Sequence, residues 1–123
     1  MMKNSSDLGE KKSAIGSLVG AFFEEEFCFS SPHIKVLIDQ DLLVIRVNNF
    51  LAPAEIEIGK EKRERNSLYE MYSKLYDKVK LSLINRVNQI TCGTVISSQI
   101  DVNLETRTCL IILYLSSNLS NNA

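Results

Sequence analysis

Two short runs of β-forming residues, only two positions apart, constrain the fold of this chain most. They span His33–Asp39 and Leu42–Asn48, and Gln40 and Asp41 between them suit a two-residue hairpin turn. Pairing Asp39 with Leu42 gathers six apolar side chains on one face: Ile34, Val36, Ile38, Leu43, Ile45 and Val47. A register shift of one residue would turn this set outward, so the sequence predicts both the hairpin and its register.

A first helix is predicted before the hairpin, over Ser13–Phe27. Ser13 is a suitable N-cap, and apolar residues follow it at helical spacing. Residues 1–12 and 116–123 lack such periodicity, so we expect flexible ends on either side of one domain over residues 13–115. A length of 123 residues with 45% hydrophobic content suits a single domain with its own core.

A second, longer helical region follows the hairpin. Pro53 suits the first position of a helix, and apolar residues from Leu68 to Ile90 keep one helical face inward. Gly93 is then a suitable stop. The region contains two sites for a break, Gly59 and Asn66, and we expect a short helix, a kink and a long helix.

The last third of the chain predicts a second hairpin, with strands over Thr94–Val102 and Arg107–Leu115. Cys109–Leu115 is apolar on both faces, so we expect this last strand to be central or covered on both sides. The order helix, hairpin, helix, hairpin predicts an α+β two-layer sandwich with a four-stranded antiparallel sheet and helices on one face. Moving the last strand to the front would give a ferredoxin-like order, so we expect a permuted ferredoxin-like arrangement. A homodimer is expected to cover the second face if that face is bare.

Composition and charge argue against several classes of protein. Lys and Arg total 14 against 15 Asp and Glu, a net charge of −1, which provides no basic field for nucleic acid. The longest apolar run, Cys109–Leu115, is far shorter than the roughly 18 residues that span a bilayer. No signal-peptide pattern is present, so we expect a soluble cytoplasmic protein. One His and three Cys without C-x-x-C spacing predict no metal site, and we expect no cofactor.

Three side chains on the polar face of the first hairpin are candidates for binding. The predicted register places Lys35 directly opposite Arg46, and opposed like charges are unfavourable unless an anion or acidic group lies nearby. His33 lies one pair further along the same face. Two interpretations remain open: solvent or a carboxylate such as Asp39 screens the pair, or His33, Lys35 and Arg46 bind an anion or a protein partner.

The segment after the first hairpin carries a motif of a known family. Leu51-Ala52-Pro53-Ala54-Glu55 resembles the Leu-Thr-Pro-Ala-Glu of the bacterial MpsC family, named for a sodium-translocating, membrane-potential-generating system. In the family version, Thr and Glu form a capping box at a helix start; Ala52 removes the Thr half here. The resemblance implies structural roles for Leu51, Pro53, Ala54 and Glu55.

A second block resembles the same family. Ile90-Thr91-Cys92-Gly93, followed by a strand that leads to Asp101, is similar to the family's Ile-Thr-Gly and its Ser-x-His-x-Asp-like strand. Cys92 is inserted before Gly93, and Gln99 stands where the family has His. The resemblance covers about Ile15 to Tyr114 and implies structural roles for Gly93 and Asp101.

The resemblance implies a non-enzymatic accessory or regulatory protein, associated with a cation-translocating or inorganic-carbon-linked membrane complex. We expect it to be a homodimer, cytoplasmic or peripheral at the inner face of the membrane, that meets a membrane ion-transport complex or a signalling protein. The alternative is a module that senses a small anion or metabolite through Lys35 and Arg46. A third hypothesis is that the protein is an enzyme and uses His33, Asp101 or Glu55 in catalysis.

Overall fold

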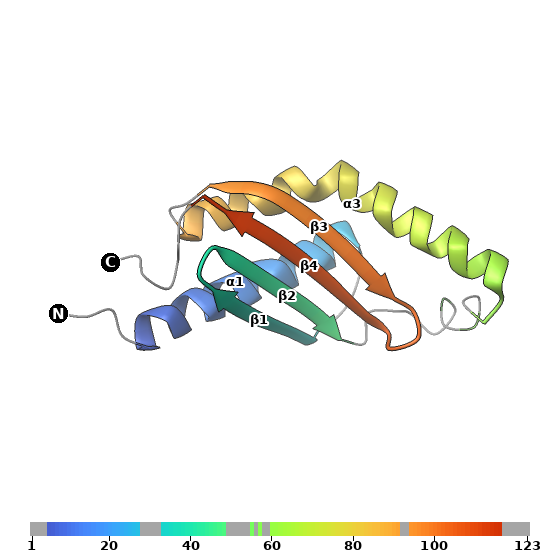
Figure 1. The fold of residues 1–123 in the computed structure, drawn as a ribbon, viewed down its shortest axis with the longest axis horizontal. Helices are drawn as coiled ribbons and strands as arrows, with labels where there is room; N and C mark the ends of the chain where they lie inside the picture. The colour runs from blue at the N-terminus through green and yellow to red at the C-terminus, as the bar shows by residue number, and fades with distance from the viewer. Residues whose placement is uncertain are drawn as a thin grey trace.

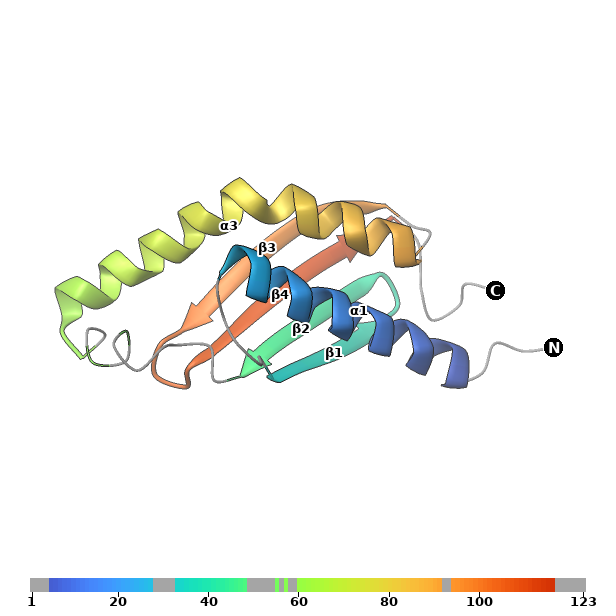
Figure 2. The same cartoon turned by 180° about the vertical axis from the view of Figure 1, so that it is seen from behind.

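The computed structural model describes residues 5–27, 33–48, 55, 57, 60–91 and 94–116. Its elements follow in the order α1 (Ser5–Glu26), β1 (His33–Asp39), β2 (Leu42–Asn48), α3 (Lys62–Thr91), β3 (Val95–Asn103) and β4 (Thr108–Leu115). Both helices lie on one face of a four-stranded sheet (Figures 1 and 2). The predicted α+β sandwich with helix-hairpin-helix-hairpin order is therefore confirmed.

The strand order in the sheet is β1-β2-β4-β3, and every neighbouring pair is antiparallel. Placing β4 ahead of α1 converts the chain order into the βαββαβ order of ferredoxin-like domains, so the arrangement agrees with a permuted version of that fold. β4 lies between β2 and β3. This confirms the central position predicted from its apolar sequence.

The first hairpin has the predicted register at every pair, from His33 opposite Asn48 to Asp39 opposite Leu42. Gln40 has a φ of 58°, the positive value that two-residue hairpin turns require at their first central residue. The backbone N–H of Leu115 donates to the carbonyl of Asp41 at 2.8 Å. This bond ties the turn to the end of β4.

The first helix begins earlier than predicted, at Ser5 rather than Ser13. The prediction placed the helix start where the apolar spacing starts. Glu10, Lys11 and Lys12 form helix readily without being buried, so the helix extends beyond its packed part. The flexible ends and the domain limits of 13–115 stay predictions, and residues 117–123 lie outside the described part of the chain.

The long helix, α3, runs from Lys62 to Thr91 and continues through Asn66, so a break at Asn66 is wrong. Glu57 is helical, Lys60 lies in a turn and Glu61 in a bend, so the interruption comes just before Lys62. The predicted helix start at Pro53 and the positions Gly59 and Gly93 lie outside the described residues.

The second hairpin is offset by one residue from its predicted limits. β3 begins at Val95 and β4 at Thr108. Asn103 ends β3, and its side-chain carbonyl accepts hydrogen bonds from the backbone N–H groups of Glu105 and Thr106, both at 3.0 Å. This Asx turn extends the connection as far as Arg107, which has a φ of 58°.

The core lies between the helices and the sheet. Phe22 and Phe23 of α1 are fully buried, with ring centroids 5.5 Å apart in an edge-to-face arrangement. Phe27 stacks on Tyr72 of α3, with ring centroids 6.1 Å apart, and Tyr76 of the same helix is also buried, so both tyrosines belong to the core. The strands supply buried apolar side chains to this core: Leu43, Ile45, Val47, Val102, Cys109, Ile111, Leu113 and Leu115.

Two leucines on α3 test this packing directly. Leu83 is 0% exposed and Leu81 is 67% exposed. We expect Leu83→Ala to lower the free energy of unfolding by about 2–5 kcal/mol, because it leaves a cavity in the core. Leu81→Ala is the matched control and should change it by less than about 0.5 kcal/mol. Urea unfolding measures both, and equal effects would contradict the described orientation of α3.

Candidate functional site

The sheet has a second face that none of the described helices and strands covers. Along each strand, residues alternate between the helices and this open face, which we define by four rows across β1, β2, β4 and β3. The rows are His33–Asn48–Thr108–Asn103, Lys35–Arg46–Leu110–Asp101, Leu37–Val44–Ile112–Gln99 and Asp39–Leu42–Tyr114–Ser97. All three residues predicted to bind an anion or partner lie on this face.

Lys35 and Arg46 are directly paired and both exposed, and His33 lies beside them in the next row. Within the described part of the chain, neither Lys35 nor Arg46 forms an ion pair. Asp39, one candidate for screening them, lies four residues from Lys35, about 13 Å along the strand, which is too far for direct contact. The structure thus brings the three residues together, and their binding role stays a prediction.

Asp101 completes the row that starts with Lys35 and Arg46. It is exposed on β3, and Leu110 of β4 separates it from Arg46. Along this row the open face is therefore basic at its β1 side and acidic at its β3 side. Sequence reasoning assigned Asp101 to a structural motif and missed this relation. The signal was available: pairing the strands of the second hairpin in the same way as those of the first places Asp101 opposite Leu110.

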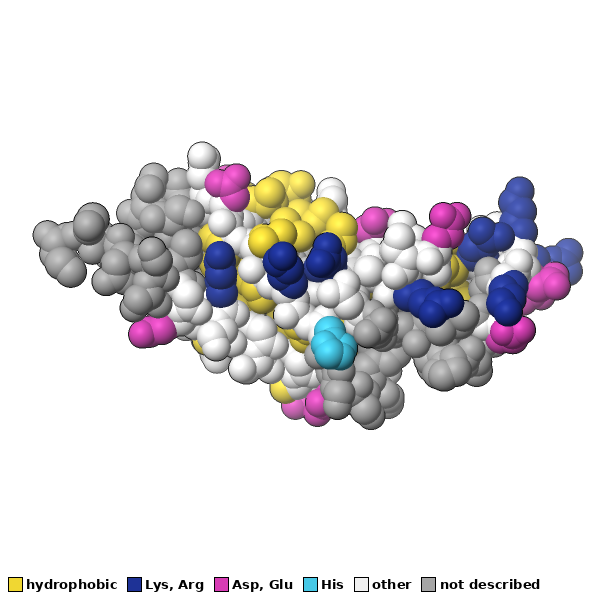
Figure 3. All heavy atoms as spheres, turned by 90° about the horizontal axis from the view of Figure 1, so that it is seen from below, with side chains coloured by type: hydrophobic (Ala, Val, Ile, Leu, Met, Phe, Trp, Pro, Cys, Tyr) yellow, Lys and Arg dark blue, Asp and Glu magenta, His cyan; other side chains and the backbone are white. Residues whose placement is uncertain are grey.

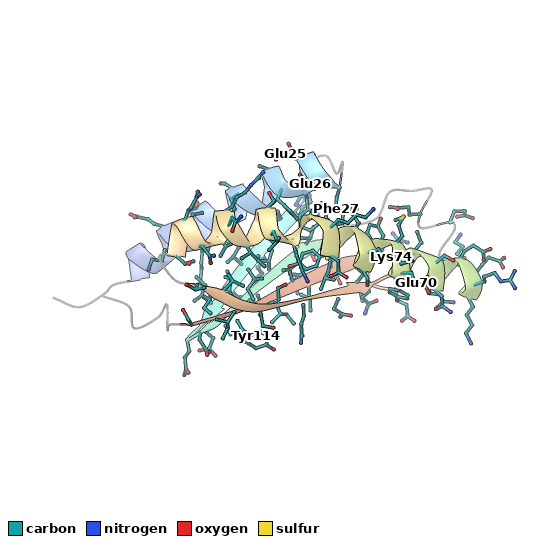
Figure 4. All side chains as sticks on the ribbon, turned by 90° about the horizontal axis from the view of Figure 1, so that it is seen from above. Glu25, Glu26, Phe27, Glu70, Lys74 and Tyr114 are labelled. Atoms are coloured by element: carbon teal, nitrogen blue, oxygen red, sulfur yellow. The ribbon has the colours of Figure 1, made fainter. Side chains whose placement is uncertain are left out.

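An apolar patch lies beside these charges on the open face: Leu37, Leu42, Val44, Leu110, Ile112 and Tyr114. Leu37 is 47% exposed and Tyr114 is 36% exposed. Figure 3 shows a hydrophobic area bordered by Lys and Arg side chains, with the imidazole beyond them, and Figure 4 shows Tyr114 on the side of the sheet away from the helices. Apolar patches on exposed faces are typical of interaction surfaces.

Among the described residues, the groups whose pKa values are clearly altered lie in the core. Burial raises the pKa of Cys109, Tyr72 and Tyr76 above their ordinary values. These groups therefore stay protonated near neutral pH and are not activated as nucleophiles or bases. Among the residues that the structure describes, no group of three or more His, Cys, Asp or Glu is placed to hold a metal ion.

A groove of about 760 Å³ runs between α1 and β1, lined by small residues of the helix and by Ile34 and Val36 of the strand. It is wide open to solvent and lies apart from the charged row.

In the described part of the chain, no helix is long and apolar enough to cross a membrane.

The model of one protein family, described as "Na+-translocating membrane potential-generating system (MpsC)", matches residues 8–117. The chain belongs to the MpsC family. No curated protein and no solved structure matches it. The family is named for a Na+-translocating membrane system.

Of the six motif residues to which the resemblance gives structural roles, two lie in the described part of the chain. Glu55 is helical, and its carboxylate accepts a hydrogen bond from the Tyr72 hydroxyl of α3. This contact ties the segment before α3 to the helix itself. Asp101 lies on the open face, exposed to solvent. The other four motif residues, Leu51, Pro53, Ala54 and Gly93, lie outside the described residues.

The buried Tyr72 hydroxyl predicts a loss of stability at high pH. Burial, and then the hydrogen bond to Glu55, raises the pKa of Tyr72 above the ordinary tyrosine value of about 10. Above about pH 10 the unfolded chain releases this proton while the native state keeps it, so the free energy of unfolding falls as pH rises, by up to about 1.4 kcal/mol per pH unit.

We therefore expect Tyr72→Phe to lose less stability than the wild type between pH 9 and 11, as measured by urea unfolding. Tyr114→Phe, a change on the opposite face of the sheet, is the control. Parallel losses for the wild type and Tyr72→Phe would contradict the buried state of this hydroxyl.

Proposed function

We propose that this chain is a non-enzymatic accessory protein of a Na+-translocating, membrane-potential-generating system. In this proposal it acts as a homodimer at the inner face of the membrane. The family match over residues 8–117 carries the proposal. The surface described above supports it, because its charged and apolar groups are arranged for contact with another protein.

The placement of the residues considered for catalysis also supports a binding role. His33 lies on the edge strand β1 and Asp101 on the opposite edge strand β3. Glu55 contacts Tyr72 on the helical side of the sheet. General acid–base and nucleophilic catalysis need such groups to converge on one substrate, and these three are spread over both faces of the sheet.

We assign contact with the membrane complex to the start of α3. At about 1.5 Å per residue, 30 residues make α3 roughly 45 Å long, and nine residues make β3 roughly 30 Å long. The start of α3 accordingly extends past the β3–β4 turn (Figure 1). The segment from Lys60 to Arg65 has four basic and two acidic side chains, with Lys62 and Arg63 exposed. A basic projection of this kind favours an acidic protein surface.

An affinity pulldown from native membranes tests this assignment. We expect the tagged wild type to recover subunits of a Na+-translocating complex, identified by mass spectrometry. Lys62→Glu combined with Arg63→Glu should lower that recovery at least about tenfold, because each change reverses a charge at the contact.

Lys74→Glu combined with Lys78→Glu is the matched control, because these two exposed lysines lie further along the same helix; Lys74 is labelled in Figure 4. The control should keep the wild-type recovery. Failure of the wild type to recover any membrane subunit would refute the proposed function.

A second candidate function is a sensor of a small anion. The direct pairing of two exposed cations, without an ion pair in the described part of the chain, favours it. In this reading Lys35 and Arg46 hold the anion between them and His33 donates a further hydrogen bond.

Titration with inorganic phosphate or bicarbonate, followed by NMR, tests the sensor. A site at the pair predicts saturable shifts of the Lys35 and Arg46 backbone amides, which Lys35→Glu combined with Arg46→Glu abolishes. Lys78→Glu on α3 should leave the shifts unchanged. Unsaturated, uniform shifts up to about 10 mM anion would exclude a sensor with a Kd below that range.

A further inference from the structure

The apolar patch of the open face is centred on the two inner strands. Five of its six residues lie on β2 and β4, where Leu42 pairs with Tyr114 and Val44 pairs with Ile112. A sheet face in water normally carries polar side chains at these positions. A partner that covers the patch therefore contacts the middle of the sheet rather than one edge.

The register makes this face complementary to itself. A rotation of 180° about an axis parallel to the strands, midway between β2 and β4, exchanges β2 with β4 and β1 with β3. Val44 then faces Ile112 of a second copy, and Leu42 faces Tyr114. Apolar side chains thus meet apolar side chains in these two rows, twice over by symmetry, while Arg46 faces Leu110 in the row of Lys35.

The same rotation matches the charges. Lys35 at the β1 side comes to lie over Asp101 at the β3 side of the second copy. Arg46 lies next to Lys35 in this row, one strand from the same carboxylate. We propose that a second copy of this chain covers the open face, with its two-fold axis parallel to the strands. This inference rests on the homodimer of the proposed function and adds the interface, the axis and the pairs of contacts.

A second symmetric arrangement competes with this one. An axis perpendicular to the strands, along the row of Val44, would place Lys35 over Asp39 of the second copy. That arrangement overlaps three of the four rows, whereas the proposed axis overlaps all four.

Interface size favours the proposed axis. Four strands about 4.8 Å apart, each seven residues long at about 3.3 Å per residue, present roughly 450 Å² in projection per copy. Two full faces bury about 900 Å² in projection, and more over the contours of the side chains, which reaches the roughly 1,000 Å² of a specific interface. The competing axis, with three overlapping rows instead of four, buries about a quarter less area.

The proposed dimer leaves the rest of the molecule free. Both helices lie on the face of the sheet opposite to the open face, in front of the sheet in Figure 2, so the start of α3 stays accessible in each copy. Lys35 and Arg46 are covered, so the dimer and the anion sensor make opposite predictions for the same pair.

Charge reversal of single residues tests the interface. We expect the purified wild type to be a dimer by sedimentation equilibrium, and Lys35→Glu or Asp101→Lys alone to weaken dimerisation at least about tenfold, because each creates two like-charge contacts. An equimolar mixture of the two variants should dimerise again, because every contact between the copies then joins opposite charges. Lys78→Glu is the control and should dimerise like the wild type.

Lys35 and Asp101 are both exposed, so we expect each variant to keep its fold, and circular dichroism checks this. Val44→Asp, at the centre of the patch, provides an independent test and should also produce monomers. Rescue of Lys35→Glu by Asp39→Lys instead of Asp101→Lys would overturn the axis.

The remaining outcomes separate this inference from the proposed function. A dimer that is insensitive to Lys35→Glu, Asp101→Lys and Val44→Asp would overturn the interface and leave the homodimer standing. A wild type that stays monomeric at about 100 µM would overturn both. Association with the membrane complex is judged independently by the pulldown.

Discussion

The position of β4 in the middle of the sheet is the constraint on which the rest of this structure depends. Its inward side chains, Cys109, Ile111, Leu113 and Leu115, are buried beneath the two helices. Its outward side chains, Leu110, Ile112 and Tyr114, supply half of the apolar patch on the open face. A strand that is apolar on both faces is unfavourable at an edge, and the order β1-β2-β4-β3 gives it a neighbour on each side. One strand thus determines both the core and the interaction surface.

The division of the molecule into two layers separates two kinds of surface. The helical layer ends in the basic start of α3, which projects past the sheet (Figure 1). The open face combines apolar side chains with charges of opposite sign at its two sides. A net charge of −1 conceals this pattern, because Lys35 and Arg46 on one side balance acidic residues elsewhere. The distribution of charge over the surface, rather than its sum, therefore bears on partner binding.

Local sequence predicted much of the fold. The register of the first hairpin followed from alternation alone, because a shift by one residue exposes every apolar side chain of the face. The candidate cluster of His33, Lys35 and Arg46 followed from the same register. The start of α1 was wrong because an apolar stripe marks where a helix packs, whereas good helix formers extend the helix beyond that stripe. Of the two positions considered for a break before the long helix, Asn66 is wrong because it lies inside α3, and Gly59 lies outside the described residues.

By itself, the sequence determined the helices and strands, their order and the inward face of the first hairpin, because these depend on spacing between residues near one another in the chain. Its MpsC motifs also indicated the family that the match over residues 8–117 shows. Only the tertiary structure decided which strand of one hairpin pairs with which strand of the other, here β2 with β4. That choice placed Asp101 in one row with Lys35 and Arg46, and it joined residues of β1, β2 and β4 into one apolar patch. Pairing between hairpins depends on contacts between residues far apart in sequence, and no local pattern encodes it.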